Sequence, residues 1–317
     1  MAITNSLDLN SLEFATKFTG ELDKVYEQES KTGFLADNAF KAKFVGARSV
    51  KIPNISLQGL GDYDRDTGFI TGTTTISNTI FTMQQDRGRS FMIDREDMDE
   101  TGVAELAGAV MSEFVRTKVI PESDAYVLSK LASFASTKSQ TVAYTTPYET
   151  FLGLLEKVQD ACGYSEQVVC FVAPEVYMGF KTDTALEKSL NVGEFKRGEV
   201  HLKVTMIDDV PLIPVSSDRM KTAYEFLSGG TGKEEGGFAP TSSAKGIKML
   251  MLPKTAAMLV KKCEKIRTFT PEQNIKADAY KFDYRLYYDC FVRTSGADAI
   301  WASIESTTTS GGTGQGS

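Results

Sequence analysis

Histidine is almost absent from this chain of 317 residues, in which His201 of the segment EVHLKVTMI is the single example. A catalytic triad or a metal centre needs several partner side chains gathered around one point. A lone histidine inside an expected strand is therefore more often structural than catalytic. No Ser/His or Cys/His constellation exists without it, so we expect no catalytic residues and no enzyme.

Cysteine is also scarce, and its four copies show neither CxxC spacing nor clustering with histidine: Cys162, Cys170, Cys263 and Cys290. This pattern argues against a zinc site and favours four free thiols that act as small apolar side chains. Acidic clusters such as Asp62, Asp64 and Asp66 alternate with arginine, so ion pairs or solvated faces explain them more simply than metal ligands do. We expect no metal.

The glycine run GGTGKEEGG, residues 229–237, superficially matches a phosphate-binding loop. The match fails because Glu234 follows Lys233 where Ser or Thr is required, and Leu227 occupies the position of the leading glycine. We therefore expect an exposed loop tip and no cofactor.

Long hydrophobic runs are missing as well: none approaches the roughly 20 residues that span a bilayer, so no membrane partner is expected. The start MAITNSLDLNSLEFATKF lacks the basic and apolar blocks of a secretory signal, which favours a cytoplasmic product. Acidic and basic residues are nearly balanced in the first fifty positions, and the net charge is −7. Tight binding to nucleic acid is accordingly disfavoured.

The chain after Ser49 has the residue pattern of an extended β-ribbon. SVKIPNISLQ precedes the turn-like segment GLGDYDRDTGFITG and the return strand TTTISNTIFTMQQDRGRSFMID. Ordering the backbone costs about 1–2 kcal/mol per residue, whereas Thr, Asn, Gln and Asp offer little apolar area to bury. We expect the ribbon to be held by another surface, most simply a second copy of the chain.

A long bent helix is predicted over residues 100–136, because apolar residues recur with helical spacing from Val103 to Val115 and Pro121 interrupts the pattern. A compact α/β unit follows over 146–250, opened by Thr146 as N-cap with Pro147 at the first helical position. The runs AAMLVKKCEKIRTF, YKFDYRLYYDCFVR and ADAIWASI read as closing strands that pack against the long helix.

This order of parts resembles the HK97-like major capsid proteins of tailed bacteriophages. Residues 59–101 resemble the extended loop of that family, and residues 114–132 (FVRTKVIPESDAYVLSKLA) resemble its spine helix; the similarity covers nearly the whole chain apart from its C-terminal tail. The resemblance implies an α+β fold with an N-terminal arm (1–47), an extended β-hairpin or E-loop (48–96), a peripheral P-domain with the spine helix (97–145), an axial α/β A-domain (146–250) and closing strands of the P-domain (251–305). The tail 306–317 has no residues able to bury and is expected to be disordered.

The resemblance also implies that the E-loop lies across a neighbouring subunit in a head-to-tail contact that closes into rings. Seven charged residues are then the candidate intersubunit contacts that set register: Asp62, Asp64, Arg65, Asp66, Asp86, Arg87 and Arg89. In the alternative interpretation these charges only keep an exposed hairpin soluble. No lysine occurs between Lys51 and Lys118, so a lysine-based covalent link from this loop is not expected.

The function implied is that of a major capsid protein, which self-assembles into pentamers and hexamers of an icosahedral head shell around double-stranded DNA. Its expected partners are other copies of itself, portal and scaffolding proteins, and packaged DNA held without sequence specificity. Either a separate scaffolding protein assists assembly or none is required. The expected location is the virion, after assembly in the host cytoplasm. The alternative is an encapsulin-like compartment that encloses cargo enzymes.

Overall fold

The computed structural model describes residues 29–41, 43–46, 48–66, 68–96, 110–164, 166–182, 191–197 and 200–305. Helices and sheets are mixed along the chain, as expected for an α+β fold. The helical elements are η1 (Gly33–Lys41), the π-helical turn η2 (Val115–Val119), α4 (Ile120–Thr137), α5 (Pro147–Cys162), α6 (Pro174–Thr182), η3 (Ser217–Arg219) and η4 (Thr294–Ala299). The strands are β1 (Lys43–Val45), β2 (Ser49–Leu57), β3 (Thr74–Thr82), β4 (Gln85–Asp94), β5 (Val168–Val172), β6 (Asn191–Arg197), β7 (Val200–Ile207), β8 (Val210–Pro214), β9 (Tyr224–Phe226), β10 (Phe238–Pro240), β11 (Ile247–Pro253), β12 (Ala257–Phe269), β13 (Ala279–Val292) and β14 (Trp301–Ile304).

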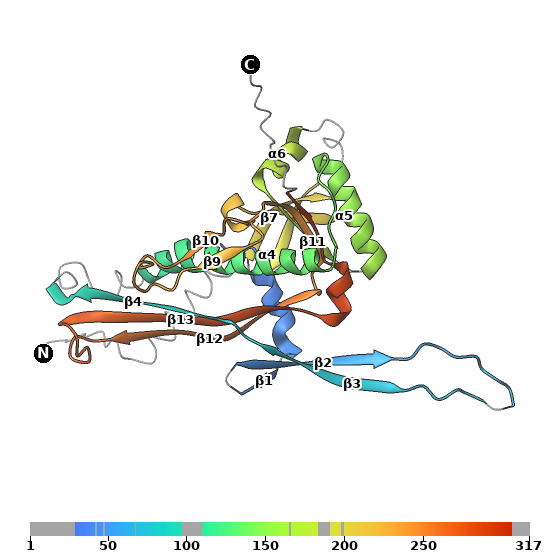
Figure 1. Cartoon of the computed structure of the whole chain (residues 1–317), viewed down its shortest axis with the longest axis horizontal. Helices are drawn as coiled ribbons and strands as arrows, with labels where there is room; N and C mark the ends of the chain where they lie inside the picture. The colour runs from blue at the N-terminus through green and yellow to red at the C-terminus, as the bar shows by residue number, and fades with distance from the viewer. Residues whose placement is uncertain are drawn as a thin grey trace, which may run out of the picture.

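Three parts of the subunit are distinct in Figure 1. A body carries α5 and α6, the helix α4 runs beside a long flat sheet below that body, and the hairpin β2–β3 projects past the end of the sheet. The strand order is β14-β11-β5-β8-β7-β6 in the body, β12-β13-β4 in the long sheet, β1-β2-β3 in the hairpin and β10-β9 in a small ribbon.

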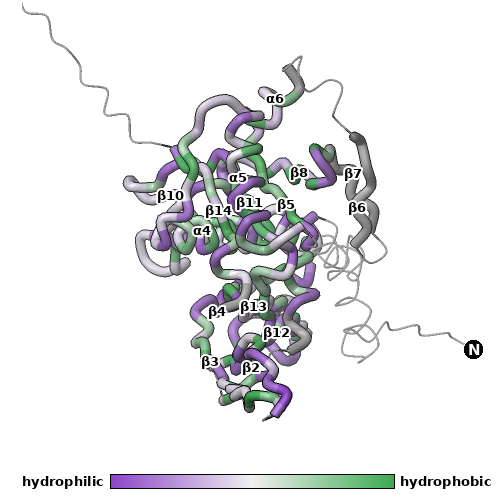
Figure 2. Tube along the Cα trace, turned by 90° about the vertical axis from the view of Figure 1, so that its right-hand side faces the viewer, coloured by the Kyte–Doolittle hydropathy of each residue, from purple (hydrophilic) through white to green (hydrophobic). Residues whose placement is uncertain are grey.

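The body has an apolar sheet at its centre. Every residue of β5 is buried, and β11 is buried at six of its seven positions, as expected for strands covered on both faces. The helix α5 begins as the sequence predicts, since the Thr146 hydroxyl accepts a 3.4 Å hydrogen bond from the Glu149 N–H and Pro147 takes the first helical position. Figure 2 places this body at the opposite end of the molecule from β2 and β3.

The spine helix contains the expected irregularity at Pro121. Residues 110–114 are α-helical, Val115–Val119 form a π-helical turn, and α4 then continues to Thr137. The Ile120 N–H bonds to the Val115 carbonyl, five residues back. Proline has no N–H to give and crowds the preceding turn, so the widened π turn accommodates it without ending the helix. The predicted segment 100–109 lies outside the described residues.

The long sheet uses the two faces of β13 for two different cores, as its alternation predicts. Leu286, Tyr288 and Cys290 join the main core under α4, where the rings of Tyr126 and Tyr288 meet edge to face with centroids 5.7 Å apart. Tyr287 and Phe291 face the opposite way into a second core. Packing of the closing strands against the spine helix is therefore confirmed.

Two strand assignments differ from the sequence-based expectation. The return strand of the ribbon is divided: β3 pairs with β2, whereas β4 leaves the hairpin and pairs with β13 from Ala279↔Asp94 to Tyr288↔Gln85. The last strand, β14, which the resemblance assigns to the closing strands of the P-domain, pairs with β11 of the body. Period-2 patterns indicate which faces are buried but not which neighbour a strand pairs with, and this explains both errors.

The first described residues, 29–32, lie against α4. Asp124 is fully buried on this helix, and its carboxylate accepts hydrogen bonds from the backbone of Lys31 and Thr32 and from both hydroxyls, Ser30 Oγ at 2.9 Å and Thr32 Oγ1 at 2.7 Å. This acceptor fixes the start of η1 against the spine helix. The first 28 residues of the predicted N-terminal arm and the tail 306–317 lie outside the described residues.

Candidate intersubunit site

The projecting hairpin is a regular antiparallel pair whose two faces differ in chemistry. Nine residue pairs run from Ser49↔Thr82 to Leu57↔Thr74, and directly opposed residues lie on the same face. One face carries Val50 and Phe81 near the base. The other carries Ile76 and Ile80, which are 67% and 62% exposed.

The base of the hairpin is anchored in its own subunit. Val50, Ile52 and Met83 are buried in the second core, which also contains Met258, Val260, Tyr287 and Phe291. The rings of Phe81 and Phe291 lie 4.9 Å apart. The expectation that the ribbon needs an external surface therefore does not hold for its base, where the intramolecular core supplies the contact.

The distal half, in contrast, presents large apolar side chains to solvent. The sequence-based expectation of a ribbon with little apolar area is wrong here. The apolar residues of the distal half are dispersed among Thr and Asp, so they form no regular pattern in the sequence. Tyr63 and Phe69 form a ring pair with centroids 4.9 Å apart at the tip. We call the following residues the distal apolar group: Leu57, Leu60, Tyr63, Phe69, Ile70 and Ile76.

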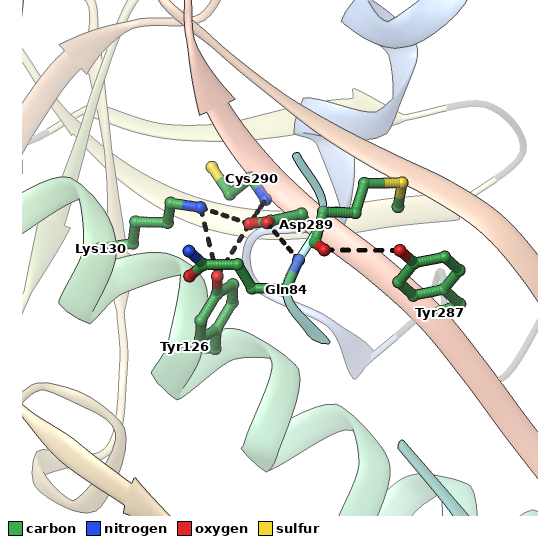
Figure 3. A network of polar contacts seen from close by, with 7 residues as sticks. Gln84, Tyr126, Lys130, Tyr287, Asp289 and Cys290 are labelled. Carbon is green, nitrogen blue, oxygen red and sulfur yellow. Dashed lines mark hydrogen bonds and ion pairs between the residues drawn. The ribbon is translucent and has the colours of Figure 1, made fainter. Parts of the chain in front are cut away.

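The junction between hairpin and long sheet is held by a buried carboxylate (Figure 3). Asp289 of β13 is fully buried and accepts a 2.9 Å hydrogen bond from the Gln84 N–H, between β3 and β4. The Tyr126 hydroxyl and the Lys130 ammonium, both from α4, bond to the same carboxylate. Burial, followed by the nearby Asp289 charge, raises the pKa of Tyr126, which keeps its hydroxyl a donor. One side chain thus joins the hairpin junction, the spine helix and β13.

The seven predicted contact residues fall into two groups. Asp62, Asp64, Arg65 and Asp66 lie exposed at the hairpin tip, where the Asp66 N–H bonds to Asp64 Oδ1 at 2.7 Å. The remaining three lie on β4, outside the hairpin. The structure therefore does not bring all seven together.

The β4 residues have partners inside their own chain. Asp86 pairs with Arg285 at 2.6 Å, and this hydrogen bond lowers the pKa of the Asp86 carboxyl. Arg87 forms a two-point contact with Glu122 of α4, with Nε to Oε1 at 2.6 Å and Nη2 to Oε2 at 3.2 Å. Arg89 donates to the Glu234 carbonyl at 3.0 Å.

Arg87 also holds the glycine-rich loop, which we call the strap (residues 227–237). Its guanidinium donates to the carbonyls of Leu227 and Gly237, the two residues that close the loop between β9 and β10. Gly229 and Gly236 have φ of 74° and 65°, and a Cβ at either would lie within 3.3 Å of Arg89 Nη1. Residues 228–235 are exposed, as predicted for a loop tip, whereas the ends of the loop are held against β4 by long-range contacts that no local sequence signal predicts.

No protein-family model and no curated protein matches the sequence. Solved structures do match: a chain of Gordonia phage Cozz at 11% identity, covering 87% of each chain with a TM-score of 0.56, and the capsid of Staphylococcus phage Andhra at 8% identity, covering 87% of this chain and 84% of that one, also at 0.56. The capsid of Cyanophage P-SCSP1u matches at 12% identity and a TM-score of 0.54, over 83% of this chain and 84% of that one. The chain has the HK97-like capsid fold.

Within this capsid fold, neither a metal cluster nor a membrane span is found in the described part of the chain. No group of three or more His, Cys, Asp or Glu residues there is arranged to hold a metal ion. No described helix has the length and apolarity needed to cross a bilayer. All four cysteines are free thiols, as expected. His201 lies in β7, but its side chain is outside the described set.

Proposed function

We propose that this chain is the major capsid protein of a tailed phage, which assembles into pentamers and hexamers of a head shell around double-stranded DNA. The observation that carries the proposal is the hairpin: its base is built into the subunit, while its distal apolar group is exposed on a fold shared with phage capsids. Exposed apolar residues of this size are typical of protein contact surfaces. Burying each stabilises a contact by roughly 1.5–3 kcal/mol.

In this proposal the distal apolar group lies on a neighbouring copy, and the contact is head to tail, so it closes rings. The tip charges Asp62, Asp64, Arg65 and Asp66 surround the apolar residues and set the register of the contact. Asp86, Arg87 and Arg89 have a different role, because their partners on α4, β13 and the strap fix the geometry of the subunit that receives or presents the hairpin.

The remaining assignments belong to the same proposal. The hairpin corresponds to the E-loop, α4 and the long sheet to the P-domain, and the body to the A-domain. Portal and scaffolding proteins are further partners, packaged DNA contacts the shell without sequence specificity, and assembly takes place in the host cytoplasm before the protein resides in the virion.

The test is the assembly of variants in which the distal apolar group is changed. We expect Leu60→Asp with Phe69→Asp to remain a monomer in native mass spectrometry and to give no shells in cryo-electron microscopy. Leu60→Met, which keeps an apolar side chain, is the matched control and should assemble. Both side chains are exposed, so urea unfolding of the monomer should be the same in all forms.

Two results would contradict the proposal. Shells of normal size from the double Asp variant would show that assembly does not require the proposed hairpin contact. Shells purified from the native host that contain protein cargo and no DNA would favour the encapsulin-like compartment over a phage head.

A further inference from the structure

A cleft of about 450 Å³ lies beside the π-helical turn, between β4, the spine helix and the strap. The charged residues Arg89, Lys118 and Glu235 and the aromatic residues Phe91 and Phe114 line it. Its size is within the range of sites that take small organic ligands. Nothing in the proposed assembly contact uses this cleft.

The wall of the cleft is aromatic and preformed. The rings of Phe91 and Phe114 meet edge to face with centroids 4.8 Å apart, and Phe114 meets Tyr284 in the same way at 5.8 Å. Gly88 of β4 also lines the cleft, and an added Cβ there would be 2.7 Å from the Tyr284 carbonyl oxygen. A planar or extended apolar group can therefore pack on this wall without rearrangement of the strands.

The polar rim has two cations that lack a carboxylate partner among the described residues. Arg87 is paired with Glu122, and Asp86 with Arg285, so these four charges are balanced. Arg89 bonds to a backbone carbonyl of the strap, and no described carboxylate lies within 4.0 Å of either Arg89 or Lys118. Three cations and three carboxylates line the cleft, but Asp86 is engaged by Arg285 outside the lining, so Glu235 is the carboxylate that remains opposite Arg89 and Lys118.

The opposite wall is main chain, because Gly229, Gly236 and Gly237 of the strap line the cleft with positive φ. The strap is joined to β4 by Arg87 and Arg89, and β4 is joined to the spine helix through Glu122. A ligand in the cleft would therefore touch all three elements at once and bind the folded subunit only.

We propose that this cleft binds an amphipathic monoanion, with an aromatic body on the Phe91 and Phe114 wall and an anionic head on Arg89 and Lys118. Charge-assisted hydrogen bonds from a guanidinium and an ammonium give the head its selectivity.

The test compares two fluorescent probes of the same shape, anilinonaphthalene sulfonate and its neutral analogue N-phenylnaphthylamine, in titrations of the full chain. Arg89→Gln with Lys118→Gln should weaken sulfonate binding by about tenfold or more and leave the neutral probe unchanged, since the aromatic wall and the Arg87 contacts that close the strap are kept. The matched control is Lys265→Gln with Arg267→Gln, which removes two exposed cations from β12 of the same sheet. It should bind both probes as the unaltered chain does.

A third variant tests the aromatic wall. Phe91→Leu keeps an apolar side chain at a half-buried position and should weaken both probes together. Sulfonate binding unchanged in the Arg89/Lys118 variant, or equally weakened in the Lys265/Arg267 control, would overturn the proposal. The titrations require no assembled shells, so the result is separate from that of the hairpin experiment.

Discussion

The Tyr126 hydroxyl donates a 2.8 Å hydrogen bond to the buried carboxylate of Asp289, across the interface between the spine helix and β13. Asp289→Ala would leave the Lys130 ammonium and the Gln84 N–H without this acceptor. Removing one member of a buried ionic network costs about 3–5 kcal/mol. We expect a loss of unfolding free energy of that size, measured by urea denaturation of the monomer.

The matched control is Asp298→Ala, which removes an exposed carboxylate 3.3 Å from Lys138. Exposed ion pairs contribute little, so this variant should differ only slightly from the unaltered chain. Asp289→Asn, which keeps an acceptor oxygen, should fall between the two. Equal stability of Asp289→Ala and Asp298→Ala would show that the carboxylate does not hold the hairpin junction.

The sequence predicts the fold well where a local rule decides the structure. The cap of α5, the disturbance at Pro121 and the two faces of β13 each follow from a short pattern, and each is confirmed. The partition of the return strand at Met83 and Gln84 follows from no such pattern. It depends on Asp289, about 200 residues away, accepting the Gln84 N–H.

Arg87 and Glu122 should be strongly coupled, since their side chains are only 24% and 14% exposed and meet at two points. In a double-mutant cycle with Arg87→Met and Glu122→Gln, we expect a coupling free energy of about 1–3 kcal/mol in urea unfolding. The exposed pair Arg116 and Glu113, joined at 2.5 Å, is the control and should show negligible coupling. Additive effects of the two substitutions on the unfolding free energy would show that Arg87 and Glu122 are not coupled.

Gly88 should not tolerate a side chain. An added Cβ would lie 2.7 Å from the Tyr284 carbonyl oxygen, which belongs to a strand backbone and cannot move aside. Gly88→Ala should lower the thermal midpoint by several degrees, as steric overpacking of about 1–3 kcal/mol implies. Gly153→Ala in α5, whose Cβ would meet Val142 at 3.5 Å, should instead leave the midpoint unchanged or raise it.

Acid should destabilise the subunit through Glu305. Hydrogen bonds from Lys248 and from the Gly246 N–H lower the pKa of this carboxyl in the folded chain. The unfolded chain then binds the proton more readily, so this contribution is complete above the unfolded pKa of about 4.3 and is lost as pH falls through the folded pKa. Glu305→Gln should flatten the fall in unfolding free energy between about pH 5 and pH 3. An unchanged dependence of the unfolding free energy on pH would show that Glu305 does not cause the loss of stability in acid. Glu156→Gln, at an exposed carboxylate, is the control.

The candidate site was only half predictable. The Asp and Arg residues near position 64 were identified because charge clusters are visible in any sequence. The apolar residues near them give no such signal, since Leu60 and Phe69 fit no period. The sequence does not reveal the partners of Arg87 and Arg89 within their own chain, because Glu122 and the strap are distant in sequence.

Only Met83 and Gln84 separate β3 of the hairpin from β4 of the long sheet. Met83 is buried in the second core, and the Gln84 N–H is bonded to Asp289. The β3–β4 connection therefore contains no flexible linker between the hairpin and the long sheet. Asp289 connects this junction to Tyr126 and Lys130 of the spine helix. In the proposed assembly, the direction of the contact with a neighbouring copy would depend on the tilt of that helix.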